Sequence, residues 1–450
     1  MTSTLAGKIN GPVLQPGDEG FPAAVAGFNL AFDPRPELVA TATSVDDVVA
    51  AVRYAREAGM RISVQGTGHG AELEIASGLL LNTSRLDHVH VDPETPTAAI
   101  GAGVRWKAVV EAAAAYGLAP ITGSSPVVGA AGYLLGGGMG PLARSHGFSS
   151  DYVIGFTVVT GEGEVVAADE HTNPDLFWAL RGGKFGLGVV IEVRVRLVEL
   201  TSVYGGSFFV DTPDIDRMLR AWVDWTDGAD DRVTTSVQAV AFPPLPEVPE
   251  PMRGRKLLGV RFAFPGDPAE GERLVAPLRA AAPVYLDMLG EIPTTEMGRI
   301  HNDPTDPIPA YVHGTMIDRA DQGLATAFLE MAGPDAADSP FFAAEWRHLG
   351  GATSRDVPGG SAVGGRESEY VVALVAARPE LFDTVVPAAA ARWDSVAAPW
   401  ISAVNNANVL AQPITPERVA ACWPDDIRER LGQVRRRYDP DGVTLGWWMP

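Results

Sequence analysis

The chain has 450 residues, of which 46% are hydrophobic and 20% are charged, a composition typical of a folded globular protein with more than one domain. Acidic residues outnumber basic ones by 56 to 35, and the formal net charge of −21 repels nucleic-acid phosphates and anionic lipid surfaces. No stretch reaches the roughly 20 apolar residues of a membrane span, and the start lacks a signal-peptide core. We therefore expect a cytoplasmic protein that binds neither nucleic acid nor a membrane. Its single cysteine, Cys422, excludes an internal disulfide and a thiolate cluster, and we expect no metal site.

The first 200 residues predict short strands connected by turns, with few helices. Residues 38–63 predict a strand, a helix and a second strand, with Ser44 as the helix cap and Gly59 as its end. Strand-like runs follow at 78–101, and a helix is predicted from Trp106.

The pattern changes at about residue 201. Amphipathic segments such as 211–226 alternate with strand-like segments such as 256–264, and proline-rich loops separate them. This alternation predicts a second α+β domain with an antiparallel sheet flanked by helices.

Two glycine clusters stand in the first half, one at Gly66, Gly68 and Gly70 and the other at 136–140. Glycine lets backbone N–H groups approach a bulky anionic ligand, but it also serves tight turns between strands, and the residues alone favour neither use. A dinucleotide fingerprint G-x-G-x-x-G/A fits the letters from Gly66 onward. Its last position should open a helix, whereas residues 70–78 lead to another strand, so the context of that fingerprint is missing.

Four motifs occur in an order that identifies a family. They are "VQGTGHG", "GSSPVVGAAGYLLGGGMGPLARSHGFSSDYVIGFTVVTGEGEV", "NPDLFWALRGG" and "RRRYDPDG". As a set they resemble the vanillyl-alcohol oxidase and p-cresol methylhydroxylase flavoprotein superfamily, in its berberine-bridge-enzyme-like branch. The resemblance implies an FAD-binding domain of the p-cresol methylhydroxylase type at residues 1–200 and 405–450, and a substrate-binding domain at 201–404.

The resemblance implies that FAD is attached covalently through one residue. His69 occupies the position of the histidine that bonds to the flavin 8-methyl group, and Gly68 and Gly70 leave its ring accessible. Many relatives add a second bond from a cysteine in G-x-C-x-x-V-G, where this chain has Ser125 in "GSSPVVG". A hydroxyl cannot form that thioether, so we expect a single covalent link.

The resemblance also assigns the remaining cofactor contacts. The segment "KFGLGVV", with Phe185, departs from the usual order of residues before its strand, which leaves the individual contacts there open. The residues expected along FAD are Gln65, Gly66, Thr67, Gly68, His69, Gly70, Ser124, Ser125, Val128, Gly129, Gly132, Tyr133, Gly138, Gly140, Gly188, Val190, Asn406 and Asn408.

The catalytic base is not where the resemblance would place it. Val372 stands at the position of the customary glutamate, and Asn406 stands at that of the customary tyrosine. A base needs a titratable group within reach of the substrate. The candidates are Tyr133, His313, Glu345, His348 and Tyr370. We choose Tyr370 first, because strand alternation places it on the same face as Val372, and Tyr133 second.

Two functions follow from the resemblance. The first is an oxidase that transfers a hydride from an alcohol or amine carbon of a small, secondary-metabolite-like molecule to flavin N5, with O₂ as the acceptor. The second is a flavin-containing cyclase or lyase with no net redox change, suggested by the absence of both customary bases.

Overall fold

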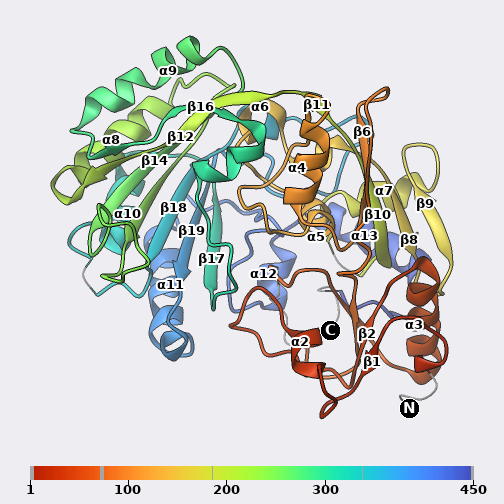
Figure 1. The fold of residues 1–450 in the computed structure, drawn as a ribbon. Helices are drawn as coiled ribbons and strands as arrows, with labels where there is room; N and C mark the ends of the chain where they lie inside the picture. Colours follow the sequence, from red (N-terminus) through yellow and green to blue (C-terminus); the bar gives the residue numbers. More distant parts are fainter. Residues whose placement is uncertain (1–4, 71–74, 185, 337, 447–450) are drawn as a thin grey trace.

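The computed structural model describes residues 5–70, 75–184, 186–336 and 338–446. Its helices and sheets form two groups, which lie side by side in Figure 1. Two sheets, of four and five strands, come from the first 200 residues, and an eight-stranded sheet comes from residues 202–376. The predicted α+β class is confirmed.

The first sheet contains the parallel strands that the sequence predicted around one helix. Its strand order is β1 (Val13–Leu14), β2 (Leu38–Thr41), β4 (Leu79–Asn82) and β3 (Ile62–Gln65). Strands β2 and β3 each pair with β4 in parallel, and α3 (Val45–Ala58) connects β2 to β3. The Ser44 hydroxyl accepts a hydrogen bond from the Asp47 N–H, and Gly59 ends the helix at φ 66°. Both predicted helix boundaries are therefore confirmed.

The second sheet is antiparallel throughout. Its strand order is β5 (Val89–Asp92), β6 (Thr97–Gly101), β10 (Val189–Arg196), β8 (Val153–Val159) and β9 (Val165–Ala168). Three helices accompany it: α4 (Trp106–Ala114), α5 (Ala130–Leu135) and α7 (Pro174–Leu180). In β10 the side chains alternate, with Val193 and Val195 buried and Arg194 and Arg196 exposed, as expected for a sheet with one covered face.

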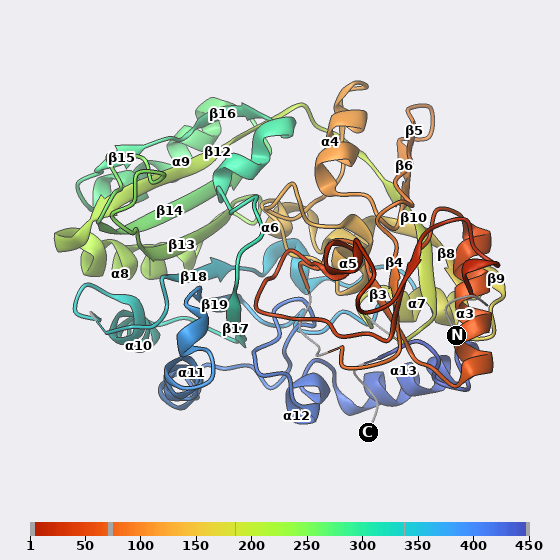
Figure 2. The same cartoon turned by 60° about the horizontal axis from the view of Figure 1, so that its bottom comes forward.

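The large sheet is also antiparallel. Its strand order is β15 (Leu286–Asp287), β12 (Ser202–Asp211), β14 (Lys256–Phe264), β13 (Thr234–Ala241), β18 (Ala343–His348), β19 (Tyr370–Ala376) and β17 (Tyr311–Ile317), and β16 (Gly290–Pro293) pairs with β12. The helices that cover it are α8 (Ile215–Thr226), α9 (Pro268–Ala281), α10 (Gln322–Ala332) and α11 (Val385–Val396). Trp222, Phe328 and Trp393 from these helices share one core with Trp346 of β18. The helices therefore occupy one face, and the other face is directed toward the first half of the chain, as Figure 2 shows.

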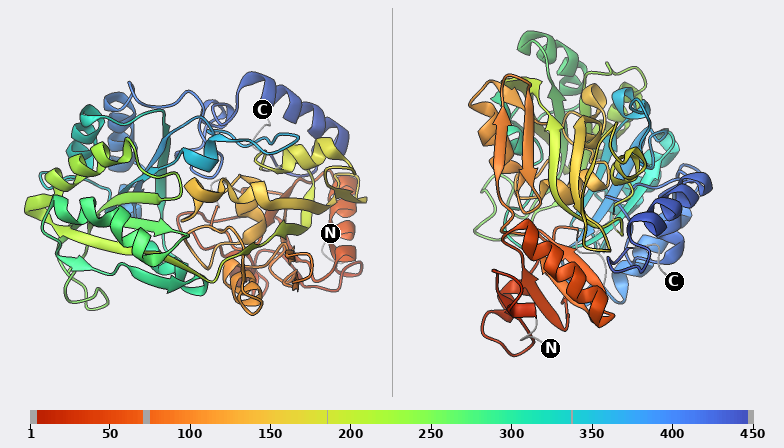
Figure 3. Two further views of the ribbon diagram at one scale, coloured as in Figure 1. Left: turned by 90° about the horizontal axis from the view of Figure 1, so that it is seen from above. Right: turned by 90° about the vertical axis from the view of Figure 1, so that its right-hand side faces the viewer.

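The chain end returns to the first half. Helix α13 (Asp425–Tyr438) packs against α7, and the Leu445 N–H donates to the Ile62 carbonyl of β3 at 2.7 Å. Both ends of the chain lie on the side of the first two sheets in Figure 3. The predicted packing of the apolar ending concerns residues 445–450, of which 447–450 lie outside the described residues.

Buried side chains form two large cores. One joins residues from Leu5 to Leu197 with Ala362 and with residues from Ala407 to Val443, and the other joins residues from Tyr204 to Ala397. Over the described ranges, no helix has the length and apolar character to cross a membrane.

Candidate active site

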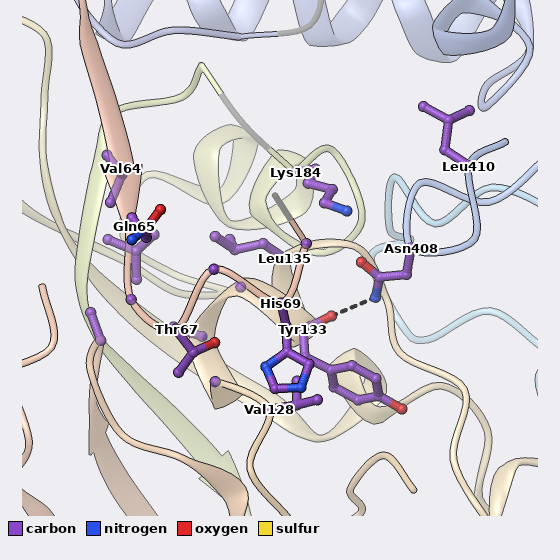
Figure 4. Close-up of a pocket in the computed structure, with 18 of the residues that line it drawn as sticks. Val64, Gln65, Thr67, His69, Val128, Tyr133, Leu135, Lys184, Asn408 and Leu410 are labelled. Atoms are coloured by element: carbon purple, nitrogen blue, oxygen red, sulfur yellow. Dashed lines mark hydrogen bonds between the residues drawn. The ribbon is translucent and has the colours of Figure 1, made fainter. Parts of the chain in front are cut away.

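A cavity of about 440 Å³ lies between the first half of the chain and the uncovered face of the large sheet. One wall consists of the loop that follows β3, helix α5 and residues 186–190, and the opposite wall consists of β17, β18 and β19. Segments 408–410 and 444–445 complete it. A volume of this size is within the range of about 300–1,000 Å³ that small-molecule sites occupy. Figure 4 shows 18 of the lining residues, among them Asn408 and Leu410 from the segment 408–410.

The loop that follows β3 is shaped by a glycine in a left-handed conformation. Gly68 has φ +67°, and a Cβ atom there would lie 2.4 Å from the Gly27 Cα. The backbone angle disfavours a side chain at this position, and the neighbouring backbone of Gly27 leaves no space for one. The carbonyl of Thr67 accepts from the Phe28 N–H at 3.0 Å, so the loop is fixed against residues 27–28 while its other side faces the cavity.

His69 lies at the centre of this loop, and its ring lines the cavity (Figure 4). It stacks on Phe28 with the ring centroids 3.6 Å apart and an interplanar angle of 14°. Its Nδ1 atom is buried and has no hydrogen-bond partner among the described residues. Burial, together with the positive charge of Arg105, lowers the pKa of His69 to about 4. The imidazole is therefore neutral near pH 7 and keeps an available lone pair.

Most of the residues expected along FAD lie in the cavity wall. A Cβ atom at Gly132, on α5, would have no atom within 4 Å, so this position opens directly into the cavity. The expected residues that line the cavity are Gln65, Gly66, Thr67, Gly68, His69, Gly70, Val128, Gly129, Gly132, Tyr133, Gly188, Val190 and Asn408.

Five expected residues do not line the cavity. The Ser124 hydroxyl donates to Asp303 at 2.6 Å, and the Ser125 hydroxyl is buried without a described partner. Gly138 and Gly140 are packing glycines, since a Cβ atom would lie 2.3 Å from the Tyr133 ring at the first and 1.7 Å from a backbone oxygen at the second. Asn406 builds a turn, because its side chain donates to the Gly364 carbonyl and accepts from the Asn408 N–H.

Several lining residues were not predicted. Lys184 is buried, and its Nζ donates to the Ala407 carbonyl at 2.7 Å. Its place beside glycines in "GGKFGLG" was the available signal. Arg347, Val371 and Ala373 come from the large sheet, and only the fold brings them to this wall.

The Tyr133 ring packs between Gly123 and Gly138. A Cβ atom at Gly123 would lie 2.9 Å from the Tyr133 Cζ atom, and the contact at Gly138 is closer. The Tyr133 hydroxyl is buried and makes no regular hydrogen bond with a described residue, although the Ser149 side chain acts on it; burial raises its pKa to about 12. Its carbonyl accepts from the Asn408 amide at 2.8 Å, the dashed line in Figure 4. The Tyr133 ring is thus fixed by packing, while its hydroxyl makes no regular hydrogen bond with a described residue.

The structure does not bring Tyr370 to the cavity. Its hydroxyl pairs with the Thr226 hydroxyl at 2.8 Å, and its ring stacks on His348 with the centroids 4.8 Å apart. Alternation along β19 does place Tyr370 and Val372 on one face, but that face is the helix-covered one. Val371 and Ala373 on the opposite face line the cavity instead. Tyr370 therefore cannot receive a proton from a molecule bound there.

Two other candidate bases share that location. His348 is buried beneath the helices, and burial together with Arg144 lowers its pKa to about 2. His313 is fully buried, and its Nε2 lies 2.6 Å from Asp394 of α11. Neither residue lines the cavity, so Tyr133 and Glu345 are the described candidates that do.

Glu345 is held between two arginines. Its Oε1 accepts from Arg261 at 3.0 Å, and both of its oxygens lie 3.1 Å from Arg347 Nη2. Burial alone would raise its pKa, but Arg347 and Arg261 hold the pKa of Glu345 well below its usual range. An ionised carboxylate so strongly stabilised is a weak base. Its role in the wall is electrostatic.

Comparisons with known proteins find an FAD binding domain in the first half of the chain. A family model for an FAD binding domain matches residues 36–169. The chain is 37% identical to (R)-6-hydroxynicotine oxidase from Paenarthrobacter nicotinovorans over 222 residues, which are 48% of each chain. It therefore aligns with about half the length of this relative.

Solved structures extend the likeness to the whole chain. The structure of 6-hydroxy-D-nicotine oxidase from Arthrobacter nicotinovorans superimposes with a TM-score of 0.82 at 26% identity, covering 97% of this chain and 96% of that one. BBE-like 1 from Physcomitrella patens gives a TM-score of 0.85 at 19% identity, with 99% and 98% covered. The chain therefore has the fold of the vanillyl-alcohol oxidase and p-cresol methylhydroxylase superfamily and contains its FAD binding domain. BBE-like proteins are among its structural neighbours, as the sequence motifs predicted.

A further neighbour in this superfamily shares the fold. Glucooligosaccharide oxidase from Acremonium strictum superimposes with a TM-score of 0.81 at 22% identity, covering 98% of this chain and 97% of that one. Its structure is described as containing a 6-S-cysteinyl, 8α-N1-histidyl FAD.

The residues in the cavity fit FAD. Gly132 leaves cavity space free where a side chain would intrude, and His69 Nδ1 is a buried nitrogen without a partner among the described residues. Lys184 adds positive charge to a cofactor site that must accept a pyrophosphate.

Proposed function

We propose that the protein is an FAD-dependent oxidase of a small molecule, with the flavin attached to His69 alone. The observation that carries this proposal is the neutral His69 imidazole, which belongs to the glycine-rich cavity wall and whose buried Nδ1 has no partner among the described residues. The histidyl link of the glucooligosaccharide oxidase supports it by analogy. Ser125 offers no thiol for a second bond.

FAD, when bound, would supply a two-electron acceptor for the oxidation of a carbon that bears a hydroxyl or amine group, with O₂ as the final acceptor. The chain's own residues would hold the reactants. The loop after β3 and the open position at Gly132 would accept the cofactor, while β18 and β19 form the wall against which a substrate would lie. Burial of this wall excludes water from the reacting atoms.

We propose a division of labour along the chain. Residues 1–200 and 405–450 bind FAD, and residues 201–404 bind the substrate. The two hydrophobic cores support this division, since each collects the helices and sheets of one part.

For proton transfer we propose Tyr133. Its hydroxyl is buried, has no described partner, and belongs to a residue in the cavity wall. Because its pKa is raised to about 12, the phenol is neutral at pH 7 and orients a substrate by hydrogen bonding before it exchanges a proton.

Two measurements test the proposal. Purified protein precipitated with acid should keep its yellow colour in the pellet, and His69→Ala should release the flavin; loss of flavin from the wild type would remove the covalent link but not FAD binding. A panel of alcohols and amines should then be mixed anaerobically with the holoenzyme. Bleaching of the flavin supports an oxidase, whereas turnover without bleaching supports a non-redox cyclase or lyase.

A further inference from the structure

Three donor residues stand in a row on the cavity face of the large sheet. Ser236 of β13 is paired in register with Arg261 of β14 on one side and with Arg347 of β18 on the other. Residues paired directly across antiparallel strands point to the same face. The row therefore presents two guanidinium groups and one hydroxyl, and Arg347 lies in the cavity wall.

The neighbouring row supplies the acceptors. Gln238 of β13 pairs in register with Glu345 of β18. Arg261 donates to Gln238 at 2.6 Å and to Glu345 at 3.0 Å, and Arg347 Nη2 donates to Glu345 at 3.1 Å. One carboxylate thus serves two guanidinium groups, and all three side chains are at most 16% exposed.

The charges of this cluster do not balance. Arg261 and Arg347 carry two positive charges and Glu345 carries one negative charge. His301 contacts the cluster, with its Nε2 3.4 Å from Glu345, but burial lowers the pKa of His301 and it adds no charge near pH 7. Asp303 also attracts Arg347, but it lies outside the cluster, is only half-buried, and already accepts from the Ser124 hydroxyl. Within the cluster itself one positive charge remains in a buried wall, which is costly unless an anion completes it.

Hydrogen-bonding capacity is also left over at the same place. The Ser236 hydroxyl, in a residue only 2% exposed, has no described partner, and neither ring nitrogen of His301 has a regular hydrogen bond. Arg347 Nη1 carries two N–H groups, and its acceptor among the described residues is the Met139 carbonyl. Unpaired buried donors that flank an excess positive charge fit an oxyanion.

We infer that the substrate carries a carboxylate, in addition to the carbon that is oxidised, and that Arg347 binds it with Arg261 and Ser236 in support. This inference rests on the proposed function and narrows its substrate class to small organic acids. A protonated amine at the same position would face the net positive charge instead. The β19 and β17 part of the wall, with Val371, Ala373 and Val312, is apolar and suits the body of such an acid.

The competing role for this charge is to stabilise the reduced flavin. Both roles predict that loss of Arg347 slows turnover, so activity alone does not separate them. Binding of a carboxylate to the oxidised holoenzyme does, because a charge that serves only the flavin gives no preference between an acid and its amide.

Holoenzyme should be titrated at low ionic strength with three acid and amide pairs, while the flavin absorbance is followed. The pairs are benzoate and benzamide, phenylacetate and phenylacetamide, and 4-hydroxybenzoate and 4-hydroxybenzamide. In at least one pair we expect the acid to bind at least about tenfold more tightly than its amide. Arg347→Gln should reduce that ratio to about one, and Glu345→Gln should increase it.

A surface variant and a second cluster variant complete the set. Arg255→Gln breaks an exposed pair with Asp211 and should leave every affinity unchanged. If Arg347→Gln does not fold, Arg261→Gln removes the same charge from behind the wall and should lower the ratio. If no acid binds more tightly than its amide in the wild type, the inference is wrong, and it is also wrong if the ratio survives both arginine variants. Flavin content, measured separately, reports whether the proposed function itself fails.

Discussion

Phenylalanine substitutions at Tyr370 and Tyr133 should have opposite effects, because each removes one buried hydroxyl from a different environment. The Tyr370 hydroxyl is paired and lies in the helix-covered core, whereas the Tyr133 hydroxyl is unpaired and belongs to the cavity wall. The two variants are matched controls for each other, since the chemical change is the same.

Tyr370→Phe should lower stability and leave flavin reduction unchanged. The variant loses the 2.8 Å hydrogen bond to Thr226, which corresponds to about 0.5–1.5 kcal/mol for a buried neutral pair. For a cooperative unit of roughly 200 residues, each 1 kcal/mol corresponds to about 2–4 °C in Tm. We therefore expect a fall of a few degrees, with stopped-flow reduction traces that match the wild type.

Tyr133→Phe should do the reverse. Removing a buried hydroxyl that makes no regular hydrogen bond with a described residue leaves the apoprotein about as stable, because only the contact with Ser149 is lost. Loss of a group that takes part in proton transfer slows reduction by about 100-fold or more. Because the pKa of Tyr133 is raised to about 12, no ionisation of this residue should appear in the wild-type rate between pH 6 and 9.

Two assays decide the matter: differential scanning fluorimetry for Tm, and anaerobic stopped-flow absorbance for flavin reduction across pH. Slow reduction in Tyr370→Phe, with normal reduction in Tyr133→Phe, would refute the geometric argument. Equal and normal reduction in both variants would leave the cavity face of the large sheet, or the substrate's own acidity, as the source of proton transfer.

Two further predictions concern the cavity and the core. Gly132→Ala should stabilise α5 by about 0.5–1 kcal/mol, because glycine is unfavourable inside a helix. The new methyl group enters open cavity space, so the variant should also contain less flavin, measured from the ratio of absorbance at 450 nm and 280 nm. Undiminished flavin would show that the cofactor avoids this wall. His348→Asn should weaken the dependence of Tm on acid pH. The pKa of His348 is lowered to about 2, so the stability that the neutral imidazole contributes is present above about pH 6.5 and is lost as pH falls, at up to about 1.4 kcal/mol per pH unit. Identical Tm profiles of the variant and the wild type from pH 7 to pH 4 would contradict this.

Sequence reasoning located the first wall of the cavity well, because the signals there are local. The glycines around His69 lie within five residues of one another, and at Gly68 the φ of +67° together with the nearby Gly27 Cα leaves room for glycine alone. Such positions restrict the residue type strongly and leave a visible pattern. The likeness in the motifs then supplied what the residues alone left open.

The second wall was not predictable in the same way. Alternation along β18 correctly separated Glu345 and Arg347 from Trp346 and His348, but it does not say which face meets the cavity. On β19 the difficulty is greater, since apolar residues occupy both faces of a strand that is buried on both sides. The prediction of Tyr370 as the base uses the correct two-residue period, but Tyr370 lies on the face that α8 covers.

Long sequence separations also conceal the charge cluster. Arg261 and Glu345 are 84 residues apart, and they meet because β13 lies between their strands. No spacing in the sequence carries that information.

Arg144, from the first half of the chain, helps to fix the position of the charged wall. Arg144, in helix α6 (Ala143–His146), is 4% exposed, and it donates to the carbonyls of Val233 and Leu349 and lies 3.0 Å from His348 Nε2. Because His348 ends β18, the same contact that joins the two halves also fixes the strand that carries Arg347 and Glu345. The lowered pKa of His348 keeps this imidazole neutral, so that it accepts from the guanidinium rather than repelling it. The alignment of the two cavity walls is therefore a property of a buried interface, to which Arg144 contributes from the first half of the chain and His348 from the large sheet.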